Sequence, residues 1–421
     1  MAQYIVIGVL FLMIICFIIG KWSYGFIMMG ACTLLAVTGA VPVSTAFSGF
    51  CDQTMIMMAS IFVISRAFGK TSLIGNIQKQ VSKMQSGKTG IILVLILIAL
   101  SIVFGQFLPS AGTMSVVIML MGILGTEGGE VCASRMILPI ALLANVWTSK
   151  IPIGMGATAA SRMNAYIEAY NPEYAVGVAD PFKAAILPLI ALTLYTLFAY
   201  KMLPKREVDS SKLRAVKEQA AMPKHQEYII YFVFVAVMAC IFLQGQLGSI
   251  TYVIQAVGVG ILIVSGAFTF DETRNVLSGD DIFLIAGSFG VSAALSSTGA
   301  GELVGKLILA LLGGNPSELM ILIVFTLVTV VMANLMNRTA IYSVLVPLAV
   351  STAIAAGFDP GPLTLAVAGC TYANALLPSC SPLIGIAMGA GKYSMKEVVR
   401  YGLPFTIIFW VTTVADILIF F

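Results

Sequence analysis

Long apolar stretches follow one another along this chain with few charges between them. Charged residues make up 10% of the 421 residues, against about 25% in a soluble domain. Stretches long enough to cross a bilayer lie at 4–20, 24–40, 54–69, 181–201, 228–244, 251–269, 281–298 and 401–421. We therefore expect an all-α polytopic membrane protein that is surrounded by lipid. Nothing in the chain indicates a nucleic-acid partner.

The remaining apolar regions are interrupted by short polar segments. Polar loops break 135–164 and 362–391, whereas 90–125 and 317–356 form hairpins that end in polar tips. Each hairpin returns to its starting side, whether it is re-entrant or fully crossing. The chain therefore crosses the membrane five times before a charged linker and five times after it. Because each half has an odd number of crossings, the two halves would be inverted repeats. We predict repeat one at 1–203, a cytoplasmic linker at 204–227 and repeat two at 228–421.

The distribution of basic residues gives this arrangement a direction. Of the 23 lysines and arginines, 18 fall in segments that would then face the cytoplasm. Cytoplasmic loops of membrane proteins carry such an excess. We therefore expect both termini outside, in a multi-pass protein of the cytoplasmic (inner) membrane. The first hairpin would enter from the cytoplasm and the second from outside. The segment 4–20 lacks a basic leader and a cleavage site, so we expect a retained span.

Four polar breaks are expected to meet near the middle of the membrane. They are the two hairpin tips, 109–113 and 336–339, and the two unwound loops, 147–156 and 377–382. Unsatisfied backbone groups at that depth cost several kcal/mol each (order of magnitude). Proline and glycine are common in membrane helices, so a single break would be unremarkable. Four breaks at matching places in two repeats favour a transport site.

Two basic residues within these breaks carry most of the functional interpretation. Lys150 lies in the first unwound loop and Arg338 in the second tip, both in otherwise uncharged surroundings. A charge at the midplane costs about 3 kcal/mol or more on insertion scales. Recognition of an anion would justify this cost, and arginine fits a carboxylate particularly well. Pairing with helix carbonyls remains the structural alternative. The sequence also leaves open whether Arg162 faces the site or the outer surface.

The candidate site residues come from all four breaks, and we predict no catalytic residues. The candidates for substrate binding are Ser110, Ala111, Gly112, Thr113, Ser149, Lys150, Asn337, Arg338, Thr339, Ser379, Cys380 and Ser381. The candidates for cation binding are Ser110, Thr148, Gly154, Asn337 and Pro378. Neither tip and neither unwound loop contains an acidic residue, which argues against a cation transporter. The seven scattered cysteines and the single histidine do not have metal-site spacing. We expect no cofactor, with sodium as a possible coupling ion.

Three segments of the second half resemble the divalent anion:sodium symporter family of the ion-transporter superfamily. Residues 281–300 (DIFLIAGSFGVSAALSSTGA), residues 373–393 (ANALLPSCSPLIGIAMGAGKY) and residues 401–404 (YGLP) resemble that family's motifs. The resemblance extends over nearly the whole chain. It implies a scaffold domain, a moving transport domain, a homodimer and an elevator mechanism. The implied substrates are di- or tricarboxylates or sulfate.

The hairpin tips depart from the family pattern, in which Ser-Asn-Thr binds sodium and substrate carboxylates. Only Ser110, Asn337 and, with a shift, Thr113 and Thr339 match those residue types. Our hypothesis is that Lys150 and Arg338 replace bound sodium. The chain would then be a sodium-independent carrier of small organic anions or an anion exchanger.

Other functions remain to be weighed against this hypothesis. The alternatives within transport are a sodium-coupled symporter of dicarboxylate or sulfate and an oxyanion efflux permease. A channel also stays open, although inverted repeats favour alternating access. An enzyme is disfavoured, because the sequence contains no nucleotide-binding loop, catalytic histidine or pair of carboxylates suited to catalysis.

Overall fold

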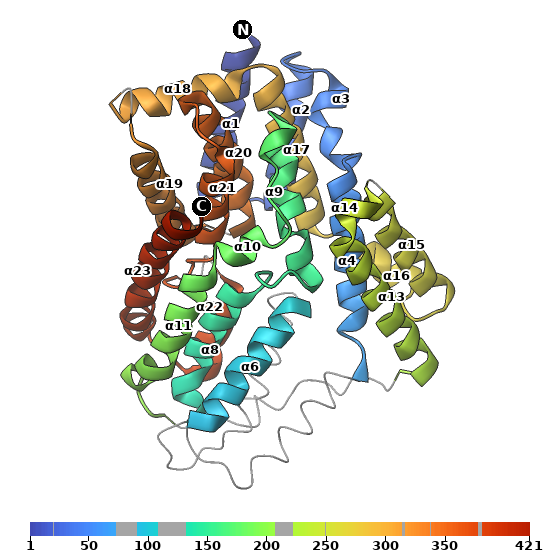
Figure 1. The fold of residues 1–421 in the computed structure, drawn as a ribbon, viewed down its shortest axis with the longest axis vertical. Helices are drawn as coiled ribbons and strands as arrows, with labels where there is room; N and C mark the ends of the chain where they lie inside the picture. The colour runs from blue at the N-terminus through green and yellow to red at the C-terminus, as the bar shows by residue number, and fades with distance from the viewer. Residues whose placement is uncertain are drawn as a thin grey trace.

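The regular structure of this chain is helical throughout the part that is described. The computed structural model describes residues 1–19, 21–72, 91–107, 132–206, 222–248, 250–313, 316–336, 338–377 and 381–421. Within these ranges there is no strand (Figure 1). The prediction of an all-α protein is therefore confirmed for the described residues.

The helices follow the expected apolar stretches closely. In the first half they are α1 (Ala2–Ile19), α2 (Tyr24–Val37), α3 (Val43–Ala46), η1 (Ser48–Phe50), α4 (Gln53–Phe68), α6 (Ile91–Phe107), α8 (Ala133–Trp147), η2 (Gly154–Thr158), α9 (Ala159–Ile167), η3 (Pro172–Tyr174), α10 (Asp180–Lys183), α11 (Ile186–Ala199) and η4 (Tyr200–Met202). In the second half they are α13 (Lys224–Phe242), α14 (Gln244–Leu247), α15 (Ile250–Val264), α16 (Phe270–Leu277), α17 (Asp280–Ser297), α18 (Ala300–Leu311), α19 (Glu318–Ala333), α20 (Arg338–Ala356), α21 (Pro360–Cys370), α22 (Pro382–Gly391) and α23 (Met395–Phe420). The break predicted at 147–156 is present, since α8 ends at Trp147. The break predicted at 377–382 begins earlier than expected, because α21 already ends at Cys370 and the next helix, α22, begins at Pro382.

Few of these helices are long enough to cross a membrane unaided. Among the described residues, α13, α20 and α23 are long and apolar enough by themselves. The pair α16 and α17, bent by 49°, can form a fourth span. Most of the other apolar helices are shorter, at 10–17 residues. The count of ten crossings and their orientation therefore remain predictions.

Two helix boundaries differ from the sequence-based expectation. Helix α23 begins at Met395 rather than at residue 401, because Ser394 and Glu397 form a capping box that starts it earlier. Pro404 consequently lies inside the helix rather than at its start. Helix α13 begins at Lys224, within the stretch expected to be linker.

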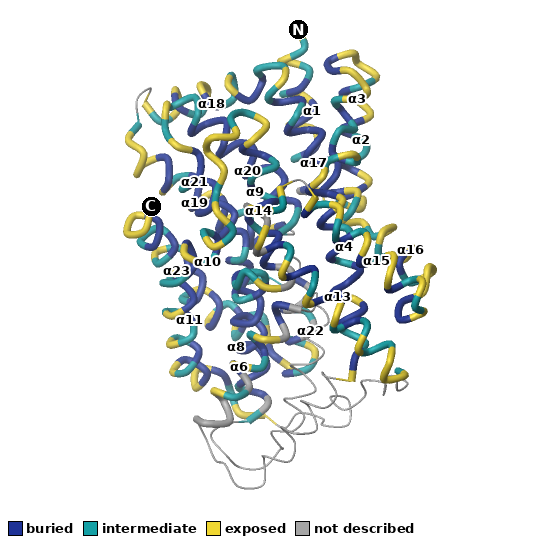
Figure 2. Tube along the Cα trace, turned by 45° about the vertical axis from the view of Figure 1, so that its right-hand side comes forward, coloured by how far each residue is buried: buried dark blue, intermediate teal, exposed yellow. Residues whose placement is uncertain are grey.

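The helices pack around three apolar cores. The first core joins α1 and α2 to α17, α18, α20 and α21. The second joins α6, α8 and α11 to α22 and α23, and the third joins α4 to α13, α15 and α16. Helices α11 and α15 expose large apolar side chains, among them Ile190, Leu194, Val253 and Val257. Figure 2 colours the trace by burial, with exposed residues in yellow. Lipid would cover these apolar side chains in a bilayer.

Glycines in α17 bring two neighbouring segments unusually close to this helix. A Cβ atom on Gly287 would lie 2.4 Å from Cγ of Met28 in α2. A Cβ atom on Gly290 would lie 2.1 Å from the backbone oxygen of Ala46 in α3. Because helices approach this closely only where the side chains are small, these glycines set the position of α17.

The helix contacts of the two halves follow a parallel pattern. Helix α2 packs on α17, and α4 packs on α15. The contact of α1 with α2 in the first half corresponds to the contact of α13 with α15 in the second. In the same way, the contact of α6 with α8 corresponds to that of α19 with α21. The last helices of the two halves, α11 and α23, pack on each other.

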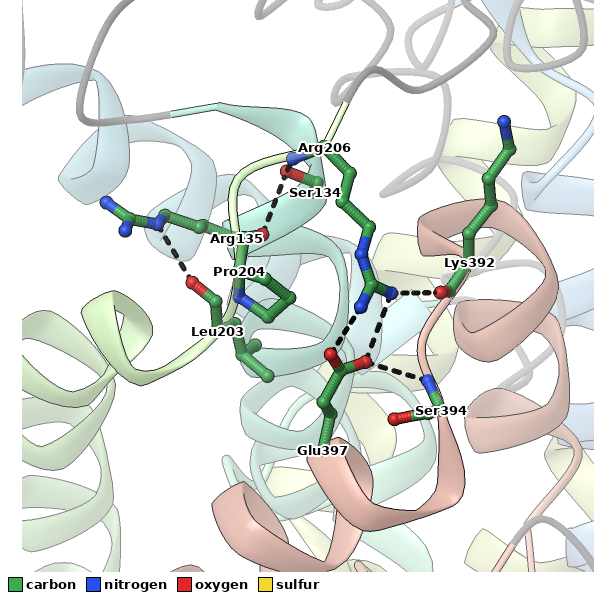
Figure 3. A network of polar contacts seen from close by, with 8 residues as sticks. All are labelled: Ser134, Arg135, Leu203, Pro204, Arg206, Lys392, Ser394 and Glu397. Atoms are coloured by element: carbon green, nitrogen blue, oxygen red, sulfur yellow. Dashed lines mark hydrogen bonds and ion pairs between the residues drawn. The ribbon is translucent and has the colours of Figure 1, made fainter.

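A polar network fastens the end of the first half to the second half (Figure 3). The guanidinium of Arg206 pairs with the carboxylate of Glu397 and donates a hydrogen bond to the carbonyl of Lys392. The amide of Arg206 donates to the Ser134 hydroxyl at 2.9 Å, and Arg135 Nε donates to the Leu203 carbonyl at 2.9 Å. The chain leaving η4 is thereby held against both α8 and the start of α23.

Candidate functional site

A cavity of about 720 Å³ lies where the three cores meet. Its walls come from α4, α9, α16, α17 and α20 and from the two unwound segments after α8 and α21. Exposed residues such as Arg66, Asn275 and Asp281 line one part of it, whereas buried residues such as Lys150 and Asn374 line another. The cavity thus extends from an accessible mouth to a buried end at the helix breaks.

Lys150 and Arg338 meet at this buried end over a single aromatic ring. Lys150 Nζ lies 4.2 Å from the ring centroid of Tyr372, and Arg338 Cζ lies 4.3 Å from the same centroid. Lys150 is only 7% exposed. Both distances lie within the range of a cation–π interaction. None of the ion pairs found among the described residues involves either side chain.

Helix ends surround these two cations. Arg338 is the first residue of α20, and Ser381 is the N-cap of α22. Both residues line the cavity, so two helix N-termini border it, and the partial positive charge there favours anions. Ser149, which follows α8, has a φ of 58°. This left-handed backbone conformation is rare for residues other than glycine. Such strain often accompanies a functional site.

A third cation, Arg162 of α9, faces the cavity as well. Its Cζ lies 3.8 Å from the ring centroid of Tyr342, and both residues line the cavity. The question that the sequence left open is therefore answered, because Arg162 faces inward. Lys150 and Arg338 thus lie over the ring of Tyr372, and Arg162 lies over the ring of Tyr342.

Amide side chains hold the two unwound segments in place. Asn145 Nδ2, in the last turn of α8, donates to Oδ1 of Asn374, which follows α21, at 2.8 Å. Asn334 accepts from the amides of Ala375 and Leu376, both at 3.0 Å, and donates to the carbonyl of Ala373.

A similar arrangement supports the end of α8. Gln106 of α6 donates to the Trp147 carbonyl at 2.8 Å. The indole of Trp147 donates to the Thr193 hydroxyl of α11 at 3.3 Å. The last residue of α8 is thus fixed from two sides, immediately before the break.

The mouth of the cavity is bordered by an ion pair between the residues that follow α4 and helix α16. Lys70 pairs with Glu272, and its Nζ also lies 5.1 Å from the ring centroid of Phe268. Next to it, the backbone amide and the hydroxyl of Ser72 both donate to Glu227 of α13. The acidic residues that line the cavity, Glu272 and Asp281, belong to this region rather than to the breaks.

Part of the predicted site lies in the described chain, and those residues come together. Thr148, Ser149, Lys150, Arg338, Thr339 and Ser381 all line the cavity. Gly154 lies in η2. Ser110, Ala111, Gly112, Thr113, Asn337, Pro378, Ser379 and Cys380 lie outside the described residues.

Sequence reasoning did not identify the aromatic and amide residues that support the cations. Tyr342 follows Arg338 by four positions on α20, and this spacing puts the two on one helix face. Tyr372 directly follows the end of α21, at the break itself. Those two signals were present in the sequence. The clamp formed by Asn334 depends on tertiary contacts alone.

Comparison with known proteins identifies a group of transporters. The family described as citrate transporter (CitMHS) matches residues 14–369, with a second, overlapping match at 249–418. The uncharacterized transporter YfbS of Escherichia coli is 32% identical over 127 residues, which are 30% of this chain and 21% of that protein. Sodium/sulfate cotransporter 2 of Chlamydomonas reinhardtii is 24% identical over 204 residues, which are 47% of this chain and 22% of that protein. The matches thus span about a fifth of the length of these relatives.

Solved structures share the fold at low sequence identity. The YdaH transporter of Alcanivorax borkumensis superposes with a TM-score of 0.63 at 14% identity, covering 88% of this chain and 85% of that one. MtrF of Neisseria gonorrhoeae, described among antimetabolite efflux pumps, gives a TM-score of 0.60 at 14% identity, covering 89% and 82%. The likeness of fold agrees with the family match, which extends over most of the chain. The chain belongs to the citrate transporter (CitMHS) family.

Proposed function

We propose that this protein is a secondary active transporter that moves small organic anions, di- or tricarboxylates, across the cytoplasmic membrane. The observation that carries the proposal is the pair Lys150 and Arg338 on the ring of Tyr372, at the buried end of the cavity. Fixed cations beside helix N-termini form a site suited to an anion. The anion would compensate charges that are costly to bury by themselves.

The same pair supports a sodium-independent mechanism. A bound sodium ion would neutralise an anionic substrate during its crossing, and a fixed lysine and arginine can take over that task. Without substrate, the two cations would have to cross the membrane uncompensated, at a cost of about 3 kcal/mol or more each. An empty carrier would therefore cross rarely. Such a restriction favours exchange of one anion for another.

The parallel helix contacts of the two halves support inverted repeats. The exchanged pairs α2 with α17 and α4 with α15, together with the contact between α11 and α23, are those expected about a twofold axis in the membrane plane. The hydrogen bond between Asn145 of the first half and Asn374 of the second half agrees with such an axis. We propose that alternating access in this protein follows an elevator mechanism and that the protein acts as a homodimer.

The deciding experiment is uptake into proteoliposomes that contain purified protein and an internal dicarboxylate. Uptake of labelled succinate should be equal in sodium and potassium buffers and should require the internal anion. Strict dependence on sodium would contradict the sodium-independent mechanism. Arg338→Ala should abolish uptake, whereas Lys306→Ala, which removes an exposed lysine paired with Glu302, should not. Unchanged uptake by Arg338→Ala would assign Arg338 a structural role.

The curated relatives favour a second candidate, a sodium-coupled symporter of sulfate. Several of them are named sodium/sulfate cotransporters. In this case sulfate would occupy the place between Lys150 and Arg338, and sodium would bind among the hydroxyl and carbonyl groups of the breaks. Sulfate uptake that requires a sodium gradient would support this candidate. Saturation without sodium and counterflow of dicarboxylate would support the first. The fold shared with MtrF leaves an oxyanion efflux permease as the remaining variant, which outward transport would reveal.

A further inference from the structure

A second pair of a cation and an aromatic ring, Arg162 and Tyr342, lines the same cavity as Lys150 and Arg338. Arg162 Cζ is 3.8 Å from the ring centroid of Tyr342, which is 6% exposed. Nε and Nη2 of Arg162 and the hydroxyl of Tyr342 are buried, and no residue of the described chain hydrogen-bonds to these three atoms. Both residues line the cavity. A group of polar atoms therefore borders the space without internal partners.

Ring contacts and a hydrogen bond hold the residues around Tyr342 in place. The ring of Tyr166 lies 6.1 Å from the ring of Tyr342 and 5.1 Å from the ring of Phe289, between centroids. The hydroxyl of Tyr166 is 2.6 Å from the hydroxyl of Ser288 in α17. Each buried donor without a partner costs about 1–3 kcal/mol. A rigid arrangement that tolerates such a cost is typical of a site that a ligand completes.

The spacing along α20 relates this cluster to the first one. Arg338 and Tyr342 are separated by four residues of the same helix and lie on one face. With a rise of 1.5 Å per residue, their positions differ by about 6 Å along the helix axis. A compact tetrahedral oxyanion has a single acidic centre, so it cannot place a separate acidic group at each cluster. An anion with an acidic group at each end can reach both.

We propose that Arg162 and Tyr342 form a second anion subsite that binds the far acidic group of the substrate and selects two-ended anions. This inference rests on the proposed function, in which Lys150 and Arg338 bind the near acidic group. The guanidinium of Arg162 offers a planar fork of donors to a carboxylate, and the Tyr342 hydroxyl offers one more. Arg162 is thus a specificity-determining residue.

The test compares succinate with succinamate, the monoamide of equal length, in binding to the purified full-length protein by titration calorimetry. The wild type should bind succinate more tightly than succinamate. In Arg162→Gln, succinate affinity should fall by about tenfold to a hundredfold, as expected for loss of a charge-assisted hydrogen bond. Succinamate affinity should change less than about threefold, which also shows that the variant is folded.

Additional variants keep the test decisive. Arg162→Lys retains the charge without the fork and should recover part of the preference for succinate. Arg274→Gln removes an exposed arginine outside the cavity, paired with Asp271, and should leave both affinities unchanged. If Arg162→Gln does not fold, the preference of Arg162→Lys decides the matter, and a preference equal to that of the wild type would overturn the proposal.

The outcomes separate this inference from the proposed function. Equal losses for succinate and succinamate in Arg162→Gln, or no loss at all, would overturn the second subsite alone. A wild type that binds sulfate but not succinate would also overturn it. A wild type that binds neither anion would overturn the proposed function itself.

Discussion

At the scale of single residues, Tyr372 explains how a buried lysine and a half-buried arginine can lie close together. Its ring is 4.2 Å from Lys150 Nζ and 4.3 Å from Arg338 Cζ. The negative face of an aromatic ring attracts cations, and it therefore offsets part of their mutual repulsion. The ring also fixes both side chains relative to the break that follows α21.

Replacement of Tyr372 by leucine should therefore weaken both the fold and the site. Two cation–π contacts are lost, at about 0.5–2 kcal/mol each, so the thermal unfolding temperature in detergent should fall and succinate binding should weaken. Tyr372→Phe keeps the ring and should behave like the wild type in unfolding. An equal loss in both variants would assign the effect to the hydroxyl instead.

The hydrogen bond between Asn145 and Asn374 permits a double-mutant cycle across the two halves. Each alanine variant leaves a buried amide without its 2.8 Å partner and should cost about 1–3 kcal/mol. The double variant should lose clearly less than the sum, because the second replacement removes no intact bond. Unfolding in detergent measures all four states. Additive losses would show that the two amides act independently.

The sequence allowed some site residues to be predicted and hid others for a physical reason. Lys150 and Arg338 were recognisable because a charge among apolar residues is rare and costly. Ser381 was recognisable because Pro382 ends helical structure before it. Asn334 was not, because its role depends on carbonyls and amides near Ala373 that only the tertiary fold brings close.

At the scale of helices, the presence of a helix was easier to predict from the sequence than the residues at which it begins and ends. Apolar length alone locates α20 and α23, but the start of α23 depends on the capping box between Ser394 and Glu397. A cap involves only a few local hydrogen bonds between polar groups, so the hydrophobic pattern of the sequence gives little indication of it. Periodicity also gives no hint that α17 packs closely on α3, because glycines carry no apolar signal.

Gly290 should be the residue at which α17 tolerates least change. An added Cβ would lie 2.1 Å from the backbone oxygen of Ala46, which cannot move without shifting α3. Gly290→Ala should destabilise the protein by about 1–3 kcal/mol or more in thermal unfolding.

Gly260→Ala in α15 is the matched control, because nothing lies within 4 Å of its added Cβ. Since alanine favours helix over glycine, the control should be neutral or stabilising by up to about 1 kcal/mol. Equal stability of the two variants would contradict the close approach of α17 and α3.

At the scale of the whole molecule, residues of all three cores border the cavity that contains Lys150. The mouth is bordered by the Lys70 and Glu272 pair, and the buried end by both unwound segments. Movement of one core relative to another would therefore change access to the same space. A carrier needs this property, since its site must open to one side at a time.

The predicted orientation can be tested with a phosphatase that is active only after export. Fusion after Phe421 should give an active enzyme, because the excess of basic residues in the other loops predicts a C-terminus outside. Fusion after Arg206, in the predicted cytoplasmic linker, should give an inactive one. The reverse result would invert the assigned topology, and activity at both points would rule out an odd number of crossings in the second half.

The fixation of Trp147 gives the protein an internal optical reporter. Gln106 and Thr193 hold this residue, which precedes Lys150 by three positions, and the chain contains only three tryptophans. With Trp22→Phe and Trp410→Phe, the remaining emission would come from the edge of the break alone. Rearrangement of the break on anion binding would then change the fluorescence of an unlabelled protein, in detergent or in a lipid membrane.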